Sequence, residues 1–110
     1  MKTISRMKSY INAVVCYPET KIPCDGPLYT RQKAFGHESL GVIAHFKNGL
    51  LHNDEGPAVE FEDAHTEYWK NGVLHNDQVN ANGLLMPAII SDYDSIHEYW
   101  IHGEKVPSPV

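Results

Sequence analysis

The chain has 110 residues, of which 42% are hydrophobic and 21% charged, and this balance is that of an ordinary globular protein. Its length supports one domain with a modest core, so residues 1–110 are treated as a single domain. The formal net charge of −5 argues against direct binding of nucleic acid or of anionic lipid, because both depend on an excess of Lys and Arg.

The sequence carries no strong targeting signal. No apolar run approaches the roughly 20 residues of a membrane helix, and the short apolar segment after Lys8 lacks a small-residue cleavage site. We therefore expect a cytoplasmic protein that does not enter a membrane. In that compartment Cys16 and Cys24 are expected to stay reduced, although the sequence leaves their redox state open.

The segment 5–24 has two interpretations. Its apolar residues recur every three or four positions, as in an amphipathic helix. However, residues 10–16 also align with residues 69–75, and β-branched Val15 followed by Pro18 disfavours a long helix. We adopt the second interpretation, in which 5–24 is a degenerate first hairpin.

A repeated phrase organises the rest of the chain. An aromatic residue, Lys-Asn-Gly, two aliphatic residues and His begin at Phe46 and again at Trp69, a shift of 23 residues. A third copy around Trp100 follows 31 residues later, with His102 in place of the Asn. Asn-Gly between apolar residues is a strong hairpin signal, because a type I′ turn requires positive φ at both central positions. Each copy is therefore predicted to contain a tight hairpin.

The second half of the unit also recurs. Pro27, Pro57 and Pro87 each begin a predicted strand, where a missing N–H costs no hydrogen bond of the ladder. Each unit then holds a strand, a variable turn, a second strand, the tight turn and a short return strand. Such units predict an all-β fold, an antiparallel meander of three to four hairpin repeats in a single curved sheet. The repeats are predicted at about 25–54, 55–77 and 84–106, and the variable turns at 31–41, 62–64 and 92–95.

The phrase EYWKNGVLH at residues 67–75 resembles the MORN repeat, whose pattern is Glu-Trp-x-Asn-Gly-x-x-His-Gly-x-Gly. Residues 45–52 match well and residues 98–106 in part, so the resemblance covers about two-thirds of the chain. After the His, this chain has Asn-Asp and then Gly-Pro-Ala where the family has Gly-x-Gly. That variant is similar to repeats of uncharacterised bacteriophage, large-virus and bacterial antitoxin-like proteins.

The resemblance implies stacked β-hairpins that bind other molecules, mostly proteins, and it transfers no catalytic residues and no cofactor. It also implies a phage or viral source, in which case the protein would act in the host cytoplasm.

Aromatic residues are the first candidate binding site. Phe46, Trp69 and Trp100 occupy equivalent positions and should align on one sheet face, with Tyr68 and Tyr99 on the other. We expect one row in the core and the other exposed, because large aromatic side chains favour partner interfaces.

Carboxylates form the second candidate. Glu60, Glu62, Asp63 and Glu67 give one hairpin an acidic strip. Such a strip usually solvates a sheet edge, and the sharper hypothesis is a surface that is complementary to a basic partner. The predicted partner-binding residues are Tyr68, Tyr99, Trp69, Trp100, Glu60, Glu62 and Glu67.

The seven histidines suggest metal binding, but their spacing favours a structural role. His52 and His75 recur at one repeat position, where an imidazole could donate to a backbone carbonyl of the next turn. His65 and His97 stand one or two positions before a glutamate, so a His/Glu pair on one sheet face is the alternative. No metal-binding motif is present, and we predict neither a metal nor a cofactor.

These features favour a small non-enzymatic binding protein that docks on a partner protein through an aromatic and acidic sheet face. If the source is a phage, an inhibitor of a host system follows by analogy. The alternative is a small-molecule or nucleotide binder with a pocket between repeats or subunits. A hydrolase is the least supported, since no nucleophile, base and orienting group can be assembled. The sequence leaves open whether an edge strand pairs two copies into a homodimer.

Overall fold

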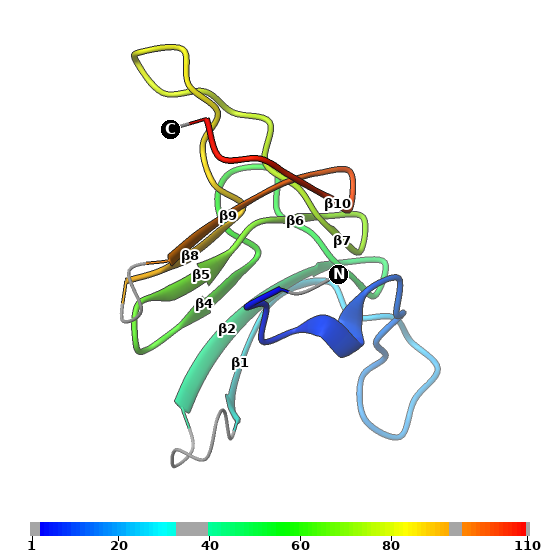
Figure 1. The fold of residues 1–110 in the computed structure, drawn as a ribbon. Helices are drawn as coiled ribbons and strands as arrows, with labels where there is room; N and C mark the ends of the chain where they lie inside the picture. The colour runs from blue at the N-terminus through cyan, green and yellow to red at the C-terminus, as the bar shows by residue number, and fades with distance from the viewer. Residues whose placement is uncertain (1–2, 33–39, 93–95, 110) are drawn as a thin grey trace.

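The strands of the protein lie side by side in an antiparallel arrangement (Figure 1). The computed structural model describes residues 3–32, 40–92 and 96–109. The strands described are β1 (Gly26–Gln32), β2 (Leu40–Lys47), β3 (Leu50–Leu51), β4 (Val59–Phe61), β5 (His65–Glu67), β6 (Trp69–Lys70), β7 (Val73–Leu74), β8 (Ile89–Ser91), β9 (Ile96–Ile101) and β10 (Glu104–Val106). The predicted all-β antiparallel fold is confirmed.

The main sheet has eight strands, in the order β1-β2-β4-β5-β8-β9-β10, with β3 paired to β2. Strands β6 and β7 form a two-stranded sheet of their own, so the described chain contains two sheets where the sequence predicted one. The main sheet is twisted but not strongly curled (Figure 1). Within the described ranges, no helix is long and apolar enough to cross a membrane.

Three tight hairpins contain the turns that the repeated phrase predicts. At each turn both central residues have positive φ, as a type I′ turn requires. His102 adopts this conformation in the third hairpin, where it replaces the Asn of the other two. The paired φ values are 53° and 82° at Asn48-Gly49, 50° and 83° at Asn71-Gly72, and 49° and 81° at His102-Gly103.

Each hairpin turn is bound by the unit that precedes it. Gly72 N–H donates to Leu51 O at 2.9 Å, and Gly103 N–H donates to Leu74 O at 2.8 Å. These bonds join successive turns and satisfy backbone groups that the turns would otherwise leave open. The hairpins therefore stack along one side of the molecule.

His52 and His75 complete this stacking. His52 Nδ1 accepts the backbone N–H of Asn71 at 3.0 Å, and His75 Nδ1 accepts that of His102 at 2.9 Å. The structural role predicted for these rings is present, but the predicted direction of the hydrogen bond was wrong, because the ring nitrogen accepts a hydrogen bond from a backbone N–H and does not donate one to a carbonyl. The type I′ turn directs the N–H of its first central residue, and not a carbonyl, toward this imidazole of the preceding unit.

The Asn that follows each of these histidines joins the unit to its own loop. Asn53 Nδ2 donates to Pro57 O at 3.0 Å, and Asn76 Nδ2 donates to Pro87 O at 2.9 Å. The same bond spans four residues in one unit and eleven in the next. The extra residues of the protruding loop 77–86 therefore explain most of the longer shift between the second and third copies of the phrase.

The N-terminal segment differs from the predicted hairpin over 5–24. Residues 3–5 are irregular and residues 6–7 form a turn, and we call residues 3–7 the strap. The strap leads into η1 (Lys8–Tyr10), a short 3-10 helix. Only an isolated bridge between Cys16 and Pro23 has hairpin character. The strap pairs with no strand, because glutamate side chains of the sheet take its backbone N–H groups.

One face of the sheet is buried beneath this N-terminal segment, and we call it the inner face. Alternate residues of each strand point into it, as the pleat requires. Met7 of the strap, which is 2% exposed, joins their cluster. The inner face contributes Val42, Ala44, Phe46, Val59, Phe61, Trp69, Ile89 and Trp100 to the core.

The two cysteines lie in different surroundings. Cys24 is buried and Cys16 is exposed, and both thiols are free. Burial raises the pKa of the Cys24 thiol, and the neighbouring Cys16 and Asp25 raise it further. A buried thiol of raised pKa is a poor nucleophile.

Two of the predicted variable turns fall on residues that are not described. The turns at 31–41 and 92–95 include residues 33–39 and 93–95, which lie outside the described ranges. The turn at 62–64 is present between β4 and β5.

A glycine comparison tests the stacking of the turns. An added Cβ on Gly49 would lie 2.9 Å from the backbone oxygen of Val15, whereas one on Gly83 would meet nothing within 4 Å. Both residues have positive φ, so alanine costs each about 1 kcal/mol of conformational strain. We expect Gly49→Ala to lower the free energy of unfolding by at least about 1 kcal/mol more than Gly83→Ala does, measured by urea titration. Equal losses would show that the turn does not pack closely against residue 15.

Candidate functional site

Glu67 on β5 is fully buried on the inner face and is surrounded by donors. Its Oε1 accepts hydrogen bonds from Ser5 Oγ at 2.8 Å and from Trp69 Nε1 at 2.9 Å. Its Oε2 accepts the Arg6 backbone N–H at 2.8 Å and lies 2.7 Å from His65 Nε2. A carboxylate can be buried when donors occupy both oxygens in this way. Glu67 thus fixes the middle of the strap to the sheet.

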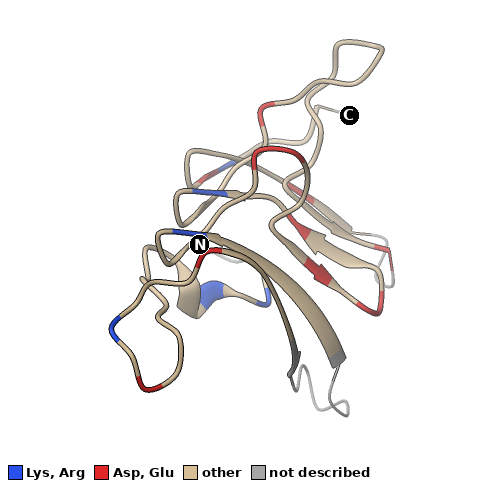
Figure 2. Ribbon diagram, turned by 180° about the vertical axis from the view of Figure 1, so that it is seen from behind, with Lys and Arg blue, Asp and Glu red and all other residues tan. Residues whose placement is uncertain are grey.

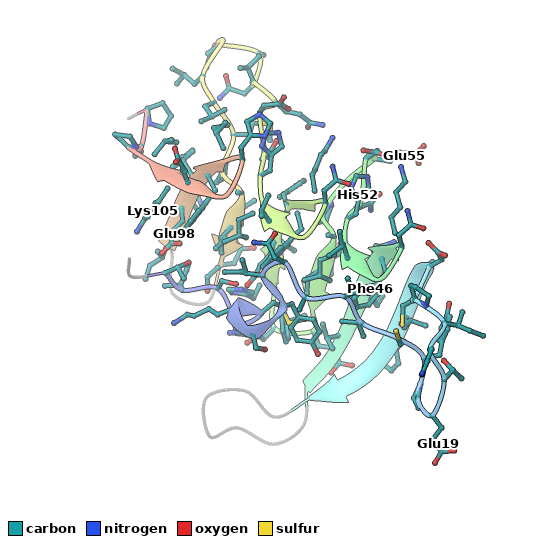
Figure 3. The ribbon with its side chains drawn as sticks, turned by 90° about the vertical axis from the view of Figure 1, so that its right-hand side faces the viewer. Glu19, Phe46, His52, Glu55, Glu98 and Lys105 are labelled. Atoms are coloured by element: carbon teal, nitrogen blue, oxygen red, sulfur yellow. The ribbon has the colours of Figure 1, made fainter. Side chains whose placement is uncertain are left out.

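Glu98 on β9 repeats the arrangement one unit later. Its Oε1 accepts hydrogen bonds from Thr3 Oγ1 at 2.6 Å and from Trp100 Nε1 at 3.0 Å. Its Oε2 accepts the Ile4 backbone N–H at 3.0 Å and lies 3.5 Å from Lys105 Nζ. Figure 3 shows Glu98 and Lys105 together, beside the N-terminal segment. Each glutamate therefore binds one hydroxyl, one indole, the next backbone N–H of the strap and one nitrogen of a basic side chain.

The strap follows the sheet with a period of two residues. Thr3 and Ser5 each donate a hydroxyl proton to a glutamate and accept the backbone N–H two residues later, at 3.1 Å in both cases. This double role fixes the backbone of the strap and directs alternate side chains toward the sheet.

The first unit lacks both partners of this motif. Ala44 stands two positions before Phe46, as Glu67 stands two before Trp69. The Phe46 side chain has no N–H to donate, and the Ala44 side chain has no carboxylate to accept one. The donor and the acceptor of the Glu–Trp pair are therefore absent together. The strap residue two positions after Ser5 is the apolar Met7, which needs no carboxylate.

Ser5, His65 and Glu67 are the residue types of a catalytic triad, but their geometry differs from one. The Ser5 hydroxyl donates to Glu67 and not to His65, so the imidazole is not placed to remove its proton as in a triad. All three side chains are buried, at 3% exposure or less, beneath the strap. A substrate carbonyl has no route to the hydroxyl, and the group serves to solvate a charge.

The structure separates the two predicted aromatic rows but exposes neither fully. Trp69 and Trp100 lie on the inner face, and Tyr68 is half-buried and packed against the core. Tyr99 lies on the other face and is 7% exposed. The predicted tyrosine platform therefore offers little contact area.

The acidic strip divides between the two faces. Glu60 and Glu62 are exposed, whereas Glu67 is buried. Figure 2 shows Asp and Glu gathered around the β4–β5 hairpin. Of the predicted partner-binding residues, only Glu60 and Glu62 are fully accessible, because strand alternation points Glu67 inward with Trp69.

The face opposite the strap, which we call the outer face, carries a row of accessible side chains. Consecutive members of the row face each other in the strand register, across five strand pairs. Tyr29 is 59% exposed and Ile43 is 37% exposed at one end. This outer row consists of Tyr29, Ile43, Glu60, Thr66, Ile90 and His97.

The sequence reasoning missed Tyr29 and Ile43, although alternation within the predicted strands could have indicated them. Tyr29 OH donates to Glu62 Oε1 at 3.0 Å, so the aromatic end of the row joins its acidic neighbour. The row thus combines an apolar end with carboxylates.

An ionic contact also fixes the strap to the turn between β4 and β5. Arg6 Nη1 lies 2.8 Å from Asp63 Oδ1, and the guanidinium carbon lies 5.0 Å from the centre of the Phe61 ring. The hydrogen bond from Arg6, strengthened by its charge, lowers the pKa of Asp63. Among the described side chains, no three of His, Cys, Asp and Glu are grouped so as to hold a metal ion.

Comparison of the chain with models of known protein families found no match, and comparisons with curated proteins and with solved structures found no significant similarity.

Glu67→Gln tests the buried carboxylate. The amide keeps the shape but presents an NH₂ group where the site supplies only donors, so one or more buried polar groups lose their partners. We expect the free energy of unfolding to fall by about 3 kcal/mol. Glu60→Gln, on the outer face, is the matched control and should change it by less than about 0.5 kcal/mol. Similar effects of the two changes would contradict the anchoring role.

The pH dependence of stability tests the second carboxylate. Burial raises the pKa of Glu98, but the hydrogen bonds from Thr3, Trp100 and Ile4 together outweigh it, so the pKa lies below its ordinary value of 4.5. Because the folded pKa is below the unfolded one, this stabilisation is present at neutral pH and is lost as the pH falls through the folded pKa.

We therefore expect the urea midpoint to fall on acidification from about pH 5 to about pH 3. Glu98→Gln should make this fall shallower. An unchanged slope in the variant would show that Glu98 does not contribute to it.

Proposed function

We propose that the chain is a small non-enzymatic binding protein, a MORN-like hairpin repeat that docks on a partner protein through the outer face of its sheet. The repeat assignment rests on the resemblance of residues 67–75 and is supported by three type I′ turns at equivalent positions.

The observation that carries the proposal is the outer row, which crosses the main sheet from β1 to β9. The strap closes the inner face, so the outer row is the continuous sheet surface left for contact. An exposed tyrosine beside an exposed isoleucine is a common anchor in protein interfaces, because both bury apolar area with few torsions to fix.

The charge of this surface indicates the kind of partner. Glu60 belongs to the row, and Glu62 adjoins it through Tyr29. With a formal net charge of −5 for the whole chain, the face is complementary to a basic protein surface that has an apolar patch at one end. A partner of this kind would associate faster at low salt than at high salt.

Tyr29→Ala and Ile43→Asp test the proposed surface. Tyr29→Ala should leave the free energy of unfolding close to that of the unmodified chain, because Tyr29 is exposed. Ile43→Asp places a second carboxylate opposite Glu60, so circular dichroism establishes that it is folded before its binding is measured. We expect each to weaken binding of the partner, captured from the cells that naturally express this protein, by about tenfold or more. The dissociation constants are measured by surface plasmon resonance with the purified partner.

Val79→Asp is the matched control, because Val79 is also exposed but lies on the protruding loop 77–86. A partner that binds Tyr29→Ala and Ile43→Asp as tightly as the unmodified chain does would rule out the outer row as the docking surface.

A further inference from the structure

The inner face of the sheet has the features of a peptide groove that already holds a ligand. We propose that it binds an extended segment of a partner protein with Ser or Thr at two alternate positions and an apolar residue two positions later. Residues 3–7 then occupy the groove as an internal copy of that ligand. This second site lies on the opposite face from the outer row and does not depend on it.

The contacts of the groove define what it recognises. Glu67 and Glu98 bind the hydroxyls of Ser5 and Thr3 and the backbone N–H of the residue after each. Backbone N–H groups are available in any extended segment, so the two glutamates select the ligand through its hydroxyls. Asp63 adds a preference for a basic residue at the position of Arg6. The shortest of these bonds, 2.6 Å from Thr3 Oγ1 to Glu98 Oε1, is a charge-assisted one.

The third position of the pattern follows from the first unit. That unit has Ala44 where the others have glutamate, so it offers an apolar surface and no acceptor side chain. Met7 is 2% exposed and belongs to the same buried cluster as Ala44. Ile4 also packs against the core and Arg6 pairs with Asp63. The pattern is therefore hydroxyl, apolar, hydroxyl, basic, apolar.

The strap can leave without the segment that follows it. Beyond η1, Asn12 N–H donates to Gly72 O at 2.9 Å and Val15 N–H donates to Gly49 O at 2.8 Å. These bonds hold residues 12–15 to the hairpin turns independently of the glutamates. Loss of residues 3–7 from the groove would leave two buried carboxylates without several of their donors. Departure is therefore favourable only when an incoming segment supplies the same hydroxyls and N–H groups.

The test uses the full chain carrying Thr3→Val and Ser5→Ala, which weaken the internal ligand without altering the groove. A fluorescein-labelled peptide with the sequence of residues 1–10 is titrated with this variant, and binding is followed by anisotropy. We expect the peptide to bind the variant at least about tenfold more tightly than it binds the unmodified chain. Thr66→Val is the matched control, because it removes a threonine hydroxyl from the outer face, and it should behave as the unmodified chain does.

A second peptide, in which Thr3 and Ser5 are replaced by Val and Ala, tests the recognition chemistry and should bind at least about tenfold more weakly. Circular dichroism establishes that the double variant is folded, and if it is not, the comparison is made with Thr3→Val alone. Absence of peptide binding by the folded variant, or equal binding of the two peptides, would overturn the proposal. The unmodified protein is also tested for dimers by mixing labelled and unlabelled chains. A dimer that exchanges its chains would overturn the proposal, because the occupant of the groove would then be the strap of a second copy.

Discussion

A carboxylate can be buried only if donors occupy both of its oxygens, and this requirement determines how the start of the chain lies on the sheet. Glu67 and Glu98 each take two donors from the strap and one from the indole two residues later in the chain. Without residues 3–6, each site would lose a hydroxyl and a backbone N–H. The strap is thus part of the solvation of two charges as well as a cover for the core.

The same need to pair buried donors with acceptors explains why the units stay in register. A type I′ turn points its first N–H away from its own hairpin, and in two units an imidazole of the preceding unit accepts it. In the first complete hairpin, Asp25 Oδ1 accepts the N–H of Asn48 at 2.9 Å instead. A carboxylate and an imidazole nitrogen serve equally well here, because the turn requires only an acceptor.

Closure of the inner face has a functional consequence for the whole molecule. The sequence suggested Trp69 and Trp100 as partner contacts, but both fill the core. Their indole N–H groups also donate to the buried glutamates. In the proposed function, contact with a partner therefore falls to the outer face, where a tyrosine, an isoleucine and carboxylates lie in one row. The inner face can take part only if the strap is exchanged for a segment with the same donors.

Much of the fold could be read from local patterns. Asn-Gly between apolar residues identified the hairpin turns, because few other dipeptides adopt positive φ at both positions. Period-two alternation placed Glu67 and Trp69 on one face, and the repeated phrase indicated that His52 and His75 serve the architecture. These features depend on neighbours in the chain and are therefore visible in the sequence.

The candidate sites were less accessible to such reasoning, because they depend on residues far apart in the chain. Thr3 and Glu98 are 95 positions apart in the chain, and Ser5 and Glu67 are 62 apart. No local sequence pattern predicts the hydrogen bond within either pair. Alternation can tell which residues share a face, but not which face the N-terminal segment will cover. The sequence alone thus determined the antiparallel hairpins and their turns, since local backbone preferences suffice for these. Only the tertiary structure decided which face is buried and which is exposed, since that choice depends on long-range donors that satisfy two buried charges.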